Sequence, residues 1–465
     1  MNSLNSYIID FELINSINKD ILYKYKILPI KKYKIYTLVA IVNNSINKKE
    51  LEKIFNSPIK LIIISKKEFE YEMIYLDFKY EIYKYANLAL NENLQNTNYS
   101  NIEQFNKKLF KFAIYLNSSD IHIETQKESM IIRFRINGIL KQLFNLEYKL
   151  YYILSSSVKL ISSLDISQKR IPQNGRFSLD IKDKSFDFRV SIMPSIHGES
   201  IVIRILDNKN AHINLEDIGF SNEVYQQVRK NINYSSGLIL ITGPTGSGKT
   251  TTMYSILNKL NNSTKKIITI EDPIEYDLKG VIQININEQI GLSYDEVLKN
   301  ILRQDPDILM IGEIRDEKTL KIAIQASLTG HLVFATIHTN SAIKTLNRLV
   351  DLKAERFLIS STLRMIVSQK LIRILCDNCK EELNINNQKI YRAKGCNKCN
   401  LSGYIKRELL AEVLTIDNKI ASMINEKVNI TNIKEYSKYK TIMQIAYDKI
   451  KLGQTTLEEY YKNEI

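Results

Sequence analysis

The chain has 465 residues, of which 44% are hydrophobic and 25% are charged, so it is long enough for about three ordinary globular domains. Its formal net charge of +14 fits a nucleic-acid or anionic-membrane partner, but no compact Arg/Lys block accompanies it, and the abundance of Lys, Asn, Ile and Tyr favours AT-rich codon usage as the simpler explanation. No apolar run approaches the roughly 18 residues that span a bilayer, the start is not a signal peptide, and four cysteines do not make a disulfide scaffold, so we expect a cytosolic protein.

Residues 1–100 are predicted to form a small α/β domain. Tyr36–Val42 and Ile59–Ser65 have the apolar, β-branched composition of strands. Residues 11–27 and 47–56 carry apolar side chains at helical spacing. The segment Asn91–Asn101 is polar and aperiodic, so we expect a linker there.

The rest of the chain is predicted to hold four further regions. Residues 102–210 form a second α/β domain, in which Ile131–Ile136 and Phe186–Ser191 alternate as half-buried strands do. Residues 211–370 alternate between strand-like and helix-like segments, which predicts a parallel sheet covered by helices on both faces. The last two regions are residues 371–410, with all four cysteines, and residues 411–465, which are predicted to be helical.

The segment Gly243-Pro-Thr-Gly-Ser-Gly-Lys-Thr250 has the pattern of a phosphate-binding P-loop. It lies between the apolar strand-like run Gly237–Thr242 and the helix-like run Thr251–Leu260, which is the context that this motif requires. Lys249 is expected to reach the β- and γ-phosphates, and the Thr250 hydroxyl to ligate Mg²⁺. The predicted nucleotide-binding residues are Gly243, Pro244, Thr245, Gly246, Ser247, Gly248, Lys249, Thr250 and Thr251.

Three more apolar strand-like segments end in polar side chains. They end in Glu271 and Asp272, in Glu313, and in His338. Because ligands bind at the carboxyl ends of strands in an open parallel sheet, these side chains are predicted to share the edge that holds the P-loop. Phosphoryl transfer needs one carboxylate to organise Mg²⁺, another to position the attacking water, and a polar residue to sense the γ-phosphate. Taken singly, each of them could instead be a helix cap or a solvated loop charge.

Arginines give a second signal for phosphate chemistry. Arg303, Arg315 and Arg348 flank the strand-like segments, and Arg189 and Arg204 lie on strand-like segments of the preceding domain. Guanidinium groups match the charge that develops on a leaving phosphate. Taken singly, each arginine is better explained by a surface ion pair.

The cysteines form two Cys-x₂-Cys pairs, Cys376 with Cys379 and Cys396 with Cys399. This spacing predicts a tetrahedral Zn²⁺ site. Four unrelated buried thiols fit less well because polar residues surround each pair, and a cytosolic redox pair is a weaker alternative.

Together these segments resemble, over about residues 110–415, the secretion ATPases of bacterial type II secretion systems and type IV pilus assembly. In the domain before the P-loop the similar motifs are Ser119-Asp-Ile-His-Ile-Glu124, Arg133-Phe-Arg-Ile-Asn-Gly138, Arg170-Ile-Pro-Gln-Asn-Gly-Arg176, Arg189-Val-Ser191, His197-Gly-Glu199 and Arg204-Ile-Leu206. After it they are Glu271-Asp-Pro-Ile-Glu275, like the aspartate box; Asp305 to Asp316, like Walker B; Thr329 to Asn340, like the histidine box; and Gln369 to Arg373 leading into the cysteines.

This resemblance implies a RecA-like motor domain preceded by two smaller α/β domains, the second of them PAS-like. It implies a homo-hexamer that hydrolyses ATP near subunit or domain junctions, with Glu313 as the catalytic Walker B glutamate. Arg189 and Arg204 would approach the γ-phosphate, and Glu271 and His338 would complete the catalytic set. The four cysteines argue against the pilus-retraction motors, which lack the zinc module.

The resemblance also implies the partners. The ATPase would lie at the cytoplasmic face of the bacterial inner membrane, held there by platform and docking proteins, and residues 1–100 would choose the membrane partner. Nucleic acid is not expected. Two other interpretations remain open: a nucleic-acid motor that uses the positive charge and the zinc knuckles, and a zinc-stabilised scaffold whose nucleotide only orders a ring.

Overall fold

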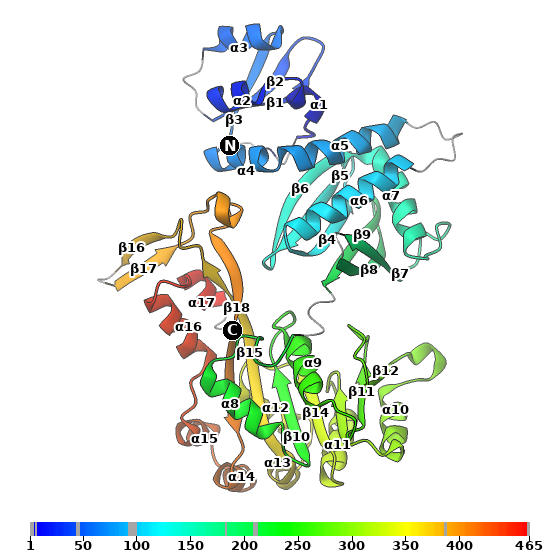
Figure 1. Ribbon diagram of the computed structural model, residues 1–465, viewed down its shortest axis with the longest axis vertical. Coiled ribbons are helices and arrows are strands. Elements are labelled where there is room, and N and C mark those ends of the chain that lie inside the picture. Colours follow the sequence, from blue (N-terminus) through cyan, green and yellow to red (C-terminus); the bar gives the residue numbers. More distant parts are fainter. Residues whose placement is uncertain are drawn as a thin grey trace. The chain divides into compact units, whose positions relative to one another are not determined.

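The computed structural model describes residues 4, 7–42, 47–91, 100–181, 184–207, 213–385 and 388–462 (Figure 1). Most of the predicted linker at residues 91–101 lies outside the described residues. The chain divides into two compact units, Met1–Asp207 and Asn208–Ile465, and each is described by itself.

The first unit begins with a three-stranded sheet in the order β1-β2-β3, in which β1 and β2 are antiparallel and β2 and β3 are parallel. The strands are β1 (Ile27–Lys32), β2 (Thr37–Ile41) and β3 (Ile59–Ile63), and the helices are α1 (Phe11–Asn15), α2 (Lys19–Tyr25), α3 (Lys48–Phe55), α4 (Lys66–Ile74) and α5 (Leu76–Asn91). Both predicted strands are confirmed. The helix predicted over residues 11–27 is two helices, because the Asn18 side chain accepts the Asp20 N–H and starts α2 anew.

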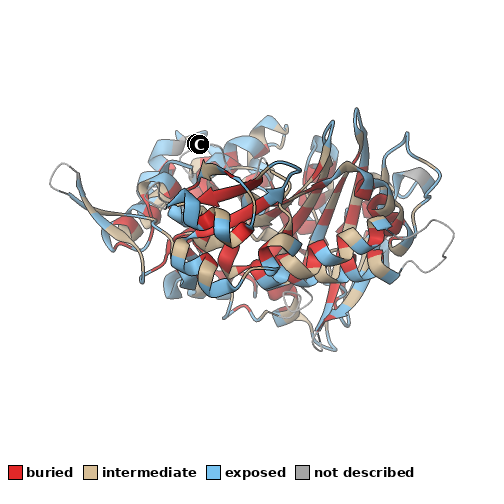
Figure 2. Cartoon of the chain, turned by 90° about the horizontal axis from the view of Figure 1, so that it is seen from above, coloured by how far each residue is buried: buried red, intermediate tan, exposed pale blue. Residues whose placement is uncertain are grey.

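The same unit continues with a six-stranded antiparallel sheet in the order β6-β5-β4-β9-β8-β7. Its elements are α6 (Ser100–Tyr115), β4 (Ser118–Thr125), β5 (Ser129–Ile136), β6 (Ile139–Glu147), α7 (Tyr148–Ile161), β7 (Gln173–Ile181), β8 (Lys184–Ser195) and β9 (Gly198–Asp207). Buried residues alternate along β5, so one face of the sheet packs against α6 and α7 (Figures 1 and 2). A single hydrophobic cluster joins side chains from Leu4 to Ile203, so residues 1–207 share one core.

The second unit contains a seven-stranded sheet in the order β12-β11-β13-β14-β10-β15-β18. Its strands are β10 (Gly237–Thr242), β11 (Ile267–Glu271), β12 (Ile282–Asn285), β13 (Ile308–Ile311), β14 (Leu332–Ile337), β15 (Leu363–Leu375) and β18 (Tyr404–Thr415). Successive residues of β10 belong to two different hydrophobic clusters: Leu238 and Leu240 to one, Ile239 and Ile241 to the other. The sheet is therefore buried on both faces, as the alternation of strands and helices predicts.

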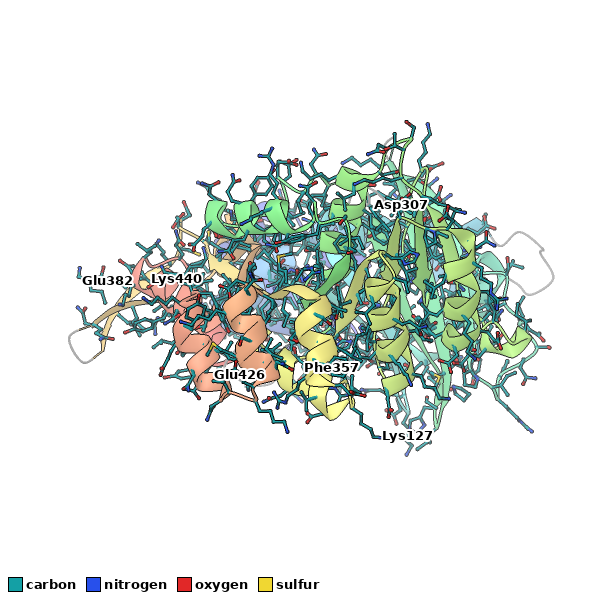
Figure 3. All side chains as sticks on the ribbon, turned by 90° about the horizontal axis from the view of Figure 1, so that it is seen from below. Lys127, Asp307, Phe357, Glu382, Glu426 and Lys440 are labelled. Atoms are coloured by element: carbon teal, nitrogen blue, oxygen red, sulfur yellow. The ribbon has the colours of Figure 1, made fainter. Side chains whose placement is uncertain are left out.

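The helices of the second unit run from α8 to α17. They are α8 (Asn222–Asn231), α9 (Lys249–Leu260), α10 (Tyr294–Ile301), α11 (Glu317–Leu328), α12 (Ala342–Asp351), α13 (Arg356–Thr362), α14 (Asn418–Asn425), α15 (Ile430–Ser437), α16 (Ile442–Lys451) and α17 (Leu457–Lys462), with 3₁₀ turns η3 (Glu288–Ile290), η4 (Leu302–Gln304) and η5 (Asn397–Cys399). Glu426, just after α14, and Lys440, between α15 and α16, are exposed, as is the large apolar side chain of Phe357 on α13, which is 54% exposed (Figure 3). Other large apolar side chains are exposed on these helices too, for example Leu328 of α11 at 52%. Within the described part of the chain, no helix is both long and apolar enough to cross a bilayer.

The helical prediction for residues 411–465 is wrong at its start. Residues 411–415 continue the strand β18, which pairs antiparallel with β15 over most of its length. The segment Leu409–Leu414, which is apolar except for Glu412, suits either a strand or a buried helix, and it forms a strand because it pairs with β15. β18 is thus the one antiparallel member of the described sheet. In the sequence, the cysteines and the hairpin of β16 (Glu381–Ile385) and β17 (Gln388–Arg392) come between β15 and β18.

Candidate functional site

The P-loop connects β10 to α9, as the sequence predicts. Gly243, Gly246 and Gly248 all have positive φ, at 148°, 77° and 90°, which side chains rarely allow. Gly248 is the N-cap of α9, so Lys249 is the first residue of that helix. The Lys249 ammonium donates to the carbonyls of Gly243, at 2.8 Å, and Pro244, at 3.2 Å, which places it within the loop. The free backbone N–H groups at the start of α9 make this a site for an anion.

Gln369 of β15 stabilises the P-loop through a hydrogen bond that sequence patterns do not predict. Its side-chain amide donates to the Ser247 carbonyl at 2.9 Å, and its side chain is fully buried. A Cβ atom on Gly243 would come within 2.2 Å of the Gln369 carbonyl oxygen, so only glycine fits there. The P-loop is therefore fixed against β15 as well as β10.

The predicted acidic strand ends meet at the P-loop edge of the sheet. β11, β13, β14 and β10 are consecutive neighbours, so Asp272, Glu313, His338 and the P-loop follow adjacent strands. His338 Nε2 lies 3.2 Å from one Glu313 oxygen, and Arg315 Nε donates to the other at 2.8 Å. Arg315 also lies 3.8 Å from Asp272. Glu313 is partly accessible, with 22% of its side chain exposed.

The charges of these groups act on one another. Burial lowers the pKa of Lys249, and Glu313 opposes that shift. Burial, Lys249 and Arg315 lower the pKa of His338 against the opposing effect of Glu313, so this imidazole is neutral at neutral pH. The hydrogen bond to Glu313 raises the pKa of Arg315. The site thus holds a lysine and an arginine near two accessible carboxylates, Glu313 and the more exposed Asp272.

Glu271, by contrast, points into the protein. It is 3% exposed, and its carboxylate accepts from the Tyr254 hydroxyl at 2.5 Å, the Thr269 hydroxyl at 2.7 Å and the Gln283 amide at 3.1 Å. Burial, followed by the charge of Glu271 and the hydrogen bond to it, raises the pKa of Tyr254, so that hydroxyl stays a donor. Glu271 directly precedes Asp272 in the sequence, but its oxygens accept hydrogen bonds from three side chains inside the protein.

A hydroxyl network holds the segment after β14. Thr242, the last residue of β10, accepts the Thr339 N–H at 3.0 Å and donates to the Thr339 carbonyl at 2.8 Å. The Thr339 hydroxyl lies 2.6 Å from that of Thr345, on α12. His338 is therefore attached to the strand that begins the P-loop. The sequence does not reveal this pairing, because the partners are 97 residues apart.

The two predicted arginines of the first unit are direct neighbours. Arg189 on β8 and Arg204 on β9 are paired in register, so their side chains share one face of the sheet. The row continues through Asp120 and Arg135 on one side and Arg176 on the other. Asp120 has one oxygen 3.2 Å from Arg204 Nε and the other 3.3 Å from Arg135 Nε. One buried carboxylate thus orients two members of a row of four arginines.

The remaining predicted arginines lie apart from the acidic strand ends. Arg303 is exposed on η4, and Arg348 is exposed on the last turn of α12. Of these three arginines of the second unit, Arg315 is the one that contacts Glu313 and Asp272 among the described residues.

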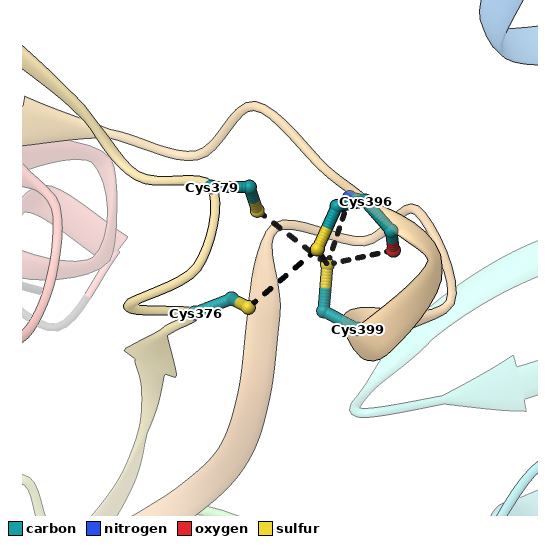
Figure 4. A group of neighbouring side chains, drawn as sticks. All are labelled: Cys376, Cys379, Cys396 and Cys399. Carbon is teal, nitrogen blue, oxygen red and sulfur yellow. Dashed lines mark hydrogen bonds between the residues drawn. The ribbon is translucent and has the colours of Figure 1, made fainter.

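The four cysteines converge, as predicted (Figure 4). Their sulfur atoms all lie within 4.8 Å of one another, with individual separations of 3.7, 3.8 and 3.9 Å. Tetrahedral zinc with Zn–S bonds of about 2.3 Å places its sulfurs about 3.8 Å apart, so the cluster has the dimensions of such a site. Cys376 follows β15 directly, and Cys396 and Cys399 bracket the turn η5.

Comparison with known proteins covers most of the chain. The profile of the family described as "Type II/IV secretion system protein" matches residues 95–462. The chain is 42% identical over 362 residues to the type II secretion system ATPase E of Vibrio cholerae, covering 75% of this chain and 72% of that protein. It is also 42% identical over 360 residues to the type II secretion system protein E of Dickeya dadantii, with the same coverage.

Solved structures agree with the fold. The pilus retraction motor PilT with bound ADP matches with a TM-score of 0.55 and 28% identity, covering 77% of this chain and 96% of that one. The ATPase DotB of Legionella pneumophila matches with a TM-score of 0.61 over 80% of this chain and 97% of that chain, at 22% identity, and shows the fold alone. The extent of the family match and the identity to the Vibrio and Dickeya proteins show that this chain belongs to the type II/IV secretion system protein family.

Proposed function

We propose that this chain is a hexameric ATPase that powers assembly of a type IV pilus or a type II secretion pseudopilus. Membership of the family supports ATP hydrolysis coupled to secretion. The observation that carries the proposal is the contact of Glu313 with His338 and Arg315 at the strand edge that holds the P-loop. A glycine-rich loop alone binds phosphate, whereas an accessible carboxylate beside it can act on the attacking water.

The residues divide the work as follows. The P-loop N–H groups and Lys249 bind the phosphates, and the Lys249 ammonium exchanges its loop carbonyls for phosphate oxygens. The Thr250 hydroxyl would be a ligand for Mg²⁺, which would neutralise phosphate charge when bound. Glu313 orients the attacking water and accepts its proton, and neutral His338 and cationic Arg315 hold that carboxylate in place. The Glu271 oxygens accept hydrogen bonds from side chains inside the protein, so in this proposal Glu271 positions β11 and is not the base.

The first unit supplies cations to the transferred phosphate. Arg189 and Arg204 lie side by side on one sheet face, and Asp120 fixes the direction of Arg204. In this proposal they approach the γ-phosphate at junctions within a ring, so that hydrolysis changes the contacts between the two units. Bound nucleotide then has different contacts in different states, which ligand-driven motion requires.

The other parts serve assembly. Cys376, Cys379, Cys396 and Cys399 would hold Zn²⁺, which fastens the loop between β15 and β18. Residues 1–100 are the proposed docking domain for an inner-membrane partner, and platform proteins pass the motion to pilin-like subunits. The ATPase itself stays peripheral, at the cytoplasmic face of the membrane.

The variant Glu313→Gln tests the catalytic assignment. It keeps the shape of the side chain and removes its ability to accept a proton, so we expect ATP binding within about twofold of the parent and turnover lowered at least about 100-fold. Binding is measured by titration calorimetry and turnover by phosphate release. Glu317→Gln is the matched control, because Glu317 pairs with Lys353 and not with the site. Normal turnover in Glu313→Gln would refute the assignment.

A further inference from the structure

Glu412 is a buried carboxylate of the second unit that lies outside the candidate catalytic edge. It lies on β18, opposite Ser368 of β15, and is 2% exposed. An ionised group at such a position is stable only when hydrogen bonds replace the lost water. The bonds that it makes therefore indicate what it is there to hold.

Its two oxygens join two different helices. One accepts the N–H of Ala342 at 2.6 Å, and the other accepts the N–H of Ile442 at 2.8 Å. Ala342 is the first residue of α12 and Ile442 is the first residue of α16. Free N–H groups and the positive end of the helix dipole both favour a carboxylate at these points. Glu412 thus fastens the starts of two helices to one strand.

The α12 side of this contact leads to the candidate catalytic edge. Three residues separate His338 from Ala342, and two of them, Thr339 and Ser341, belong to the same hydrogen-bond network. The first part of the segment is attached to Thr242 of β10, and its far end is attached to Glu412. His338, at the start of the segment, lies 3.2 Å from Glu313.

The α16 side leads to the C-terminal helices. Ile442 and Ala446 pack in one hydrophobic cluster with Ile372 and Leu410, on the strand pair that carries the cysteine loop. Any displacement of α16 along this strand pair therefore acts on the same carboxylate that holds α12.

We propose that Glu412 is a positioning residue for ATP hydrolysis: it fixes the start of α12, and through it the His338 segment, while tying both to the C-terminal helix α16. This inference rests on the proposed roles of Glu313 and His338. The two Glu412 oxygens bond helix N–H groups and not P-loop residues, so we expect its loss to act on turnover and not on nucleotide binding.

The test compares Glu412→Gln with Glu408→Gln in the full chain. An amide offers one acceptor oxygen, so its NH₂ group faces one of the two helix N–H groups and that contact is lost. We expect kcat for ATP to fall about tenfold while the Kd of a non-hydrolysable ATP analogue stays within about twofold. Glu408, on the same strand, pairs with the partly buried Lys449 on α16, and its variant keeps the parent kcat.

A second variant guards against misfolding of the first. Thr345→Val is nearly isosteric and removes the hydroxyl that bonds Thr339 and Ser341, which loosens the same segment from α12. It is expected to lower kcat at unchanged Kd as well.

An unchanged kcat in Glu412→Gln, or in Thr345→Val if the first variant does not fold, would overturn the inference. So would equal losses of kcat and affinity. Glu313→Gln, assayed in parallel, separates this outcome from failure of the proposed site, because full turnover in Glu313→Gln would refute the site itself.

Discussion

At the scale of single residues, the two glutamates that the family resemblance places in the catalytic set, Glu313 and Glu271, have different surroundings. Glu313 is partly accessible and contacts a neutral imidazole and a guanidinium, whereas Glu271 is enclosed by Tyr254, Thr269 and Gln283. A carboxylate whose oxygens are occupied by buried donors stabilises the fold, and a carboxylate at the surface of the site is available to water. In the proposed mechanism Glu313, and not Glu271, is therefore the base.

The variant Tyr254→Phe tests the structural role of Glu271. It removes one donor to a buried carboxylate, and we expect the free energy of unfolding to fall by about 1.5–3 kcal/mol, since hydrogen bonds to charged groups are worth that much. Urea denaturation of the full chain measures the change. Tyr225→Phe is the control, because its hydroxyl bonds the half-exposed Glu216 at 2.7 Å. Equal stability of the two variants would contradict this account of Glu271.

At the scale of elements, the features that could be predicted are those that short stretches of the sequence encode. The P-loop, the apolar strands that carry the acidic ends and the paired cysteines are contiguous in sequence, and each is found where it was predicted. Gln369 and Glu412 could not be found in this way. Their roles depend on contacts across 122 residues, to Ser247, and across 70 residues, to Ala342, and no periodicity reports such pairings.

The arginine row depends on one aspartate. The variant Asp120→Asn keeps the shape of the side chain but removes the charge that directs Arg204 and Arg135. We expect kcat/KM for ATP to fall about tenfold, because a misdirected guanidinium stabilises the transferred phosphate less well. Steady-state phosphate release checks this. Asp187→Asn is the matched control on β8, since the Asp187 carboxylate accepts a hydrogen bond from the exposed Ser178. Parent-like activity in Asp120→Asn would argue against a role for the row.

The cysteine cluster predicts one zinc ion per chain. Elemental analysis of protein purified without chelator should give about one equivalent of Zn²⁺, and Cys379→Ser should lose it together with several degrees of melting temperature. Asp377→Asn, within the same knuckle and with an 89% exposed side chain, should keep both. Absence of zinc from the parent protein, or an iron content in its place, would contradict the prediction.

At the scale of the whole molecule, the chain contains two compact units, with the P-loop in one and the arginine row in the other. Such a division suits a motor in which nucleotide is held by one rigid unit and contacted by another. The sequence predicted four boundaries within the chain. The boundary near residue 100 remains a prediction. A single hydrophobic core joins the residues on its two sides.

The most direct test of the assembly motor is to recover its partners from native membranes. Tagged full-length protein is captured from gently solubilised membranes, with Glu313→Gln captured in parallel to retain nucleotide-bound complexes, and bound proteins are identified by mass spectrometry. The proposal predicts a polytopic inner-membrane platform protein and a single-span docking protein. Recovery of nucleic acid with its processing proteins, and of no membrane component, would contradict the proposal and support a nucleic-acid motor.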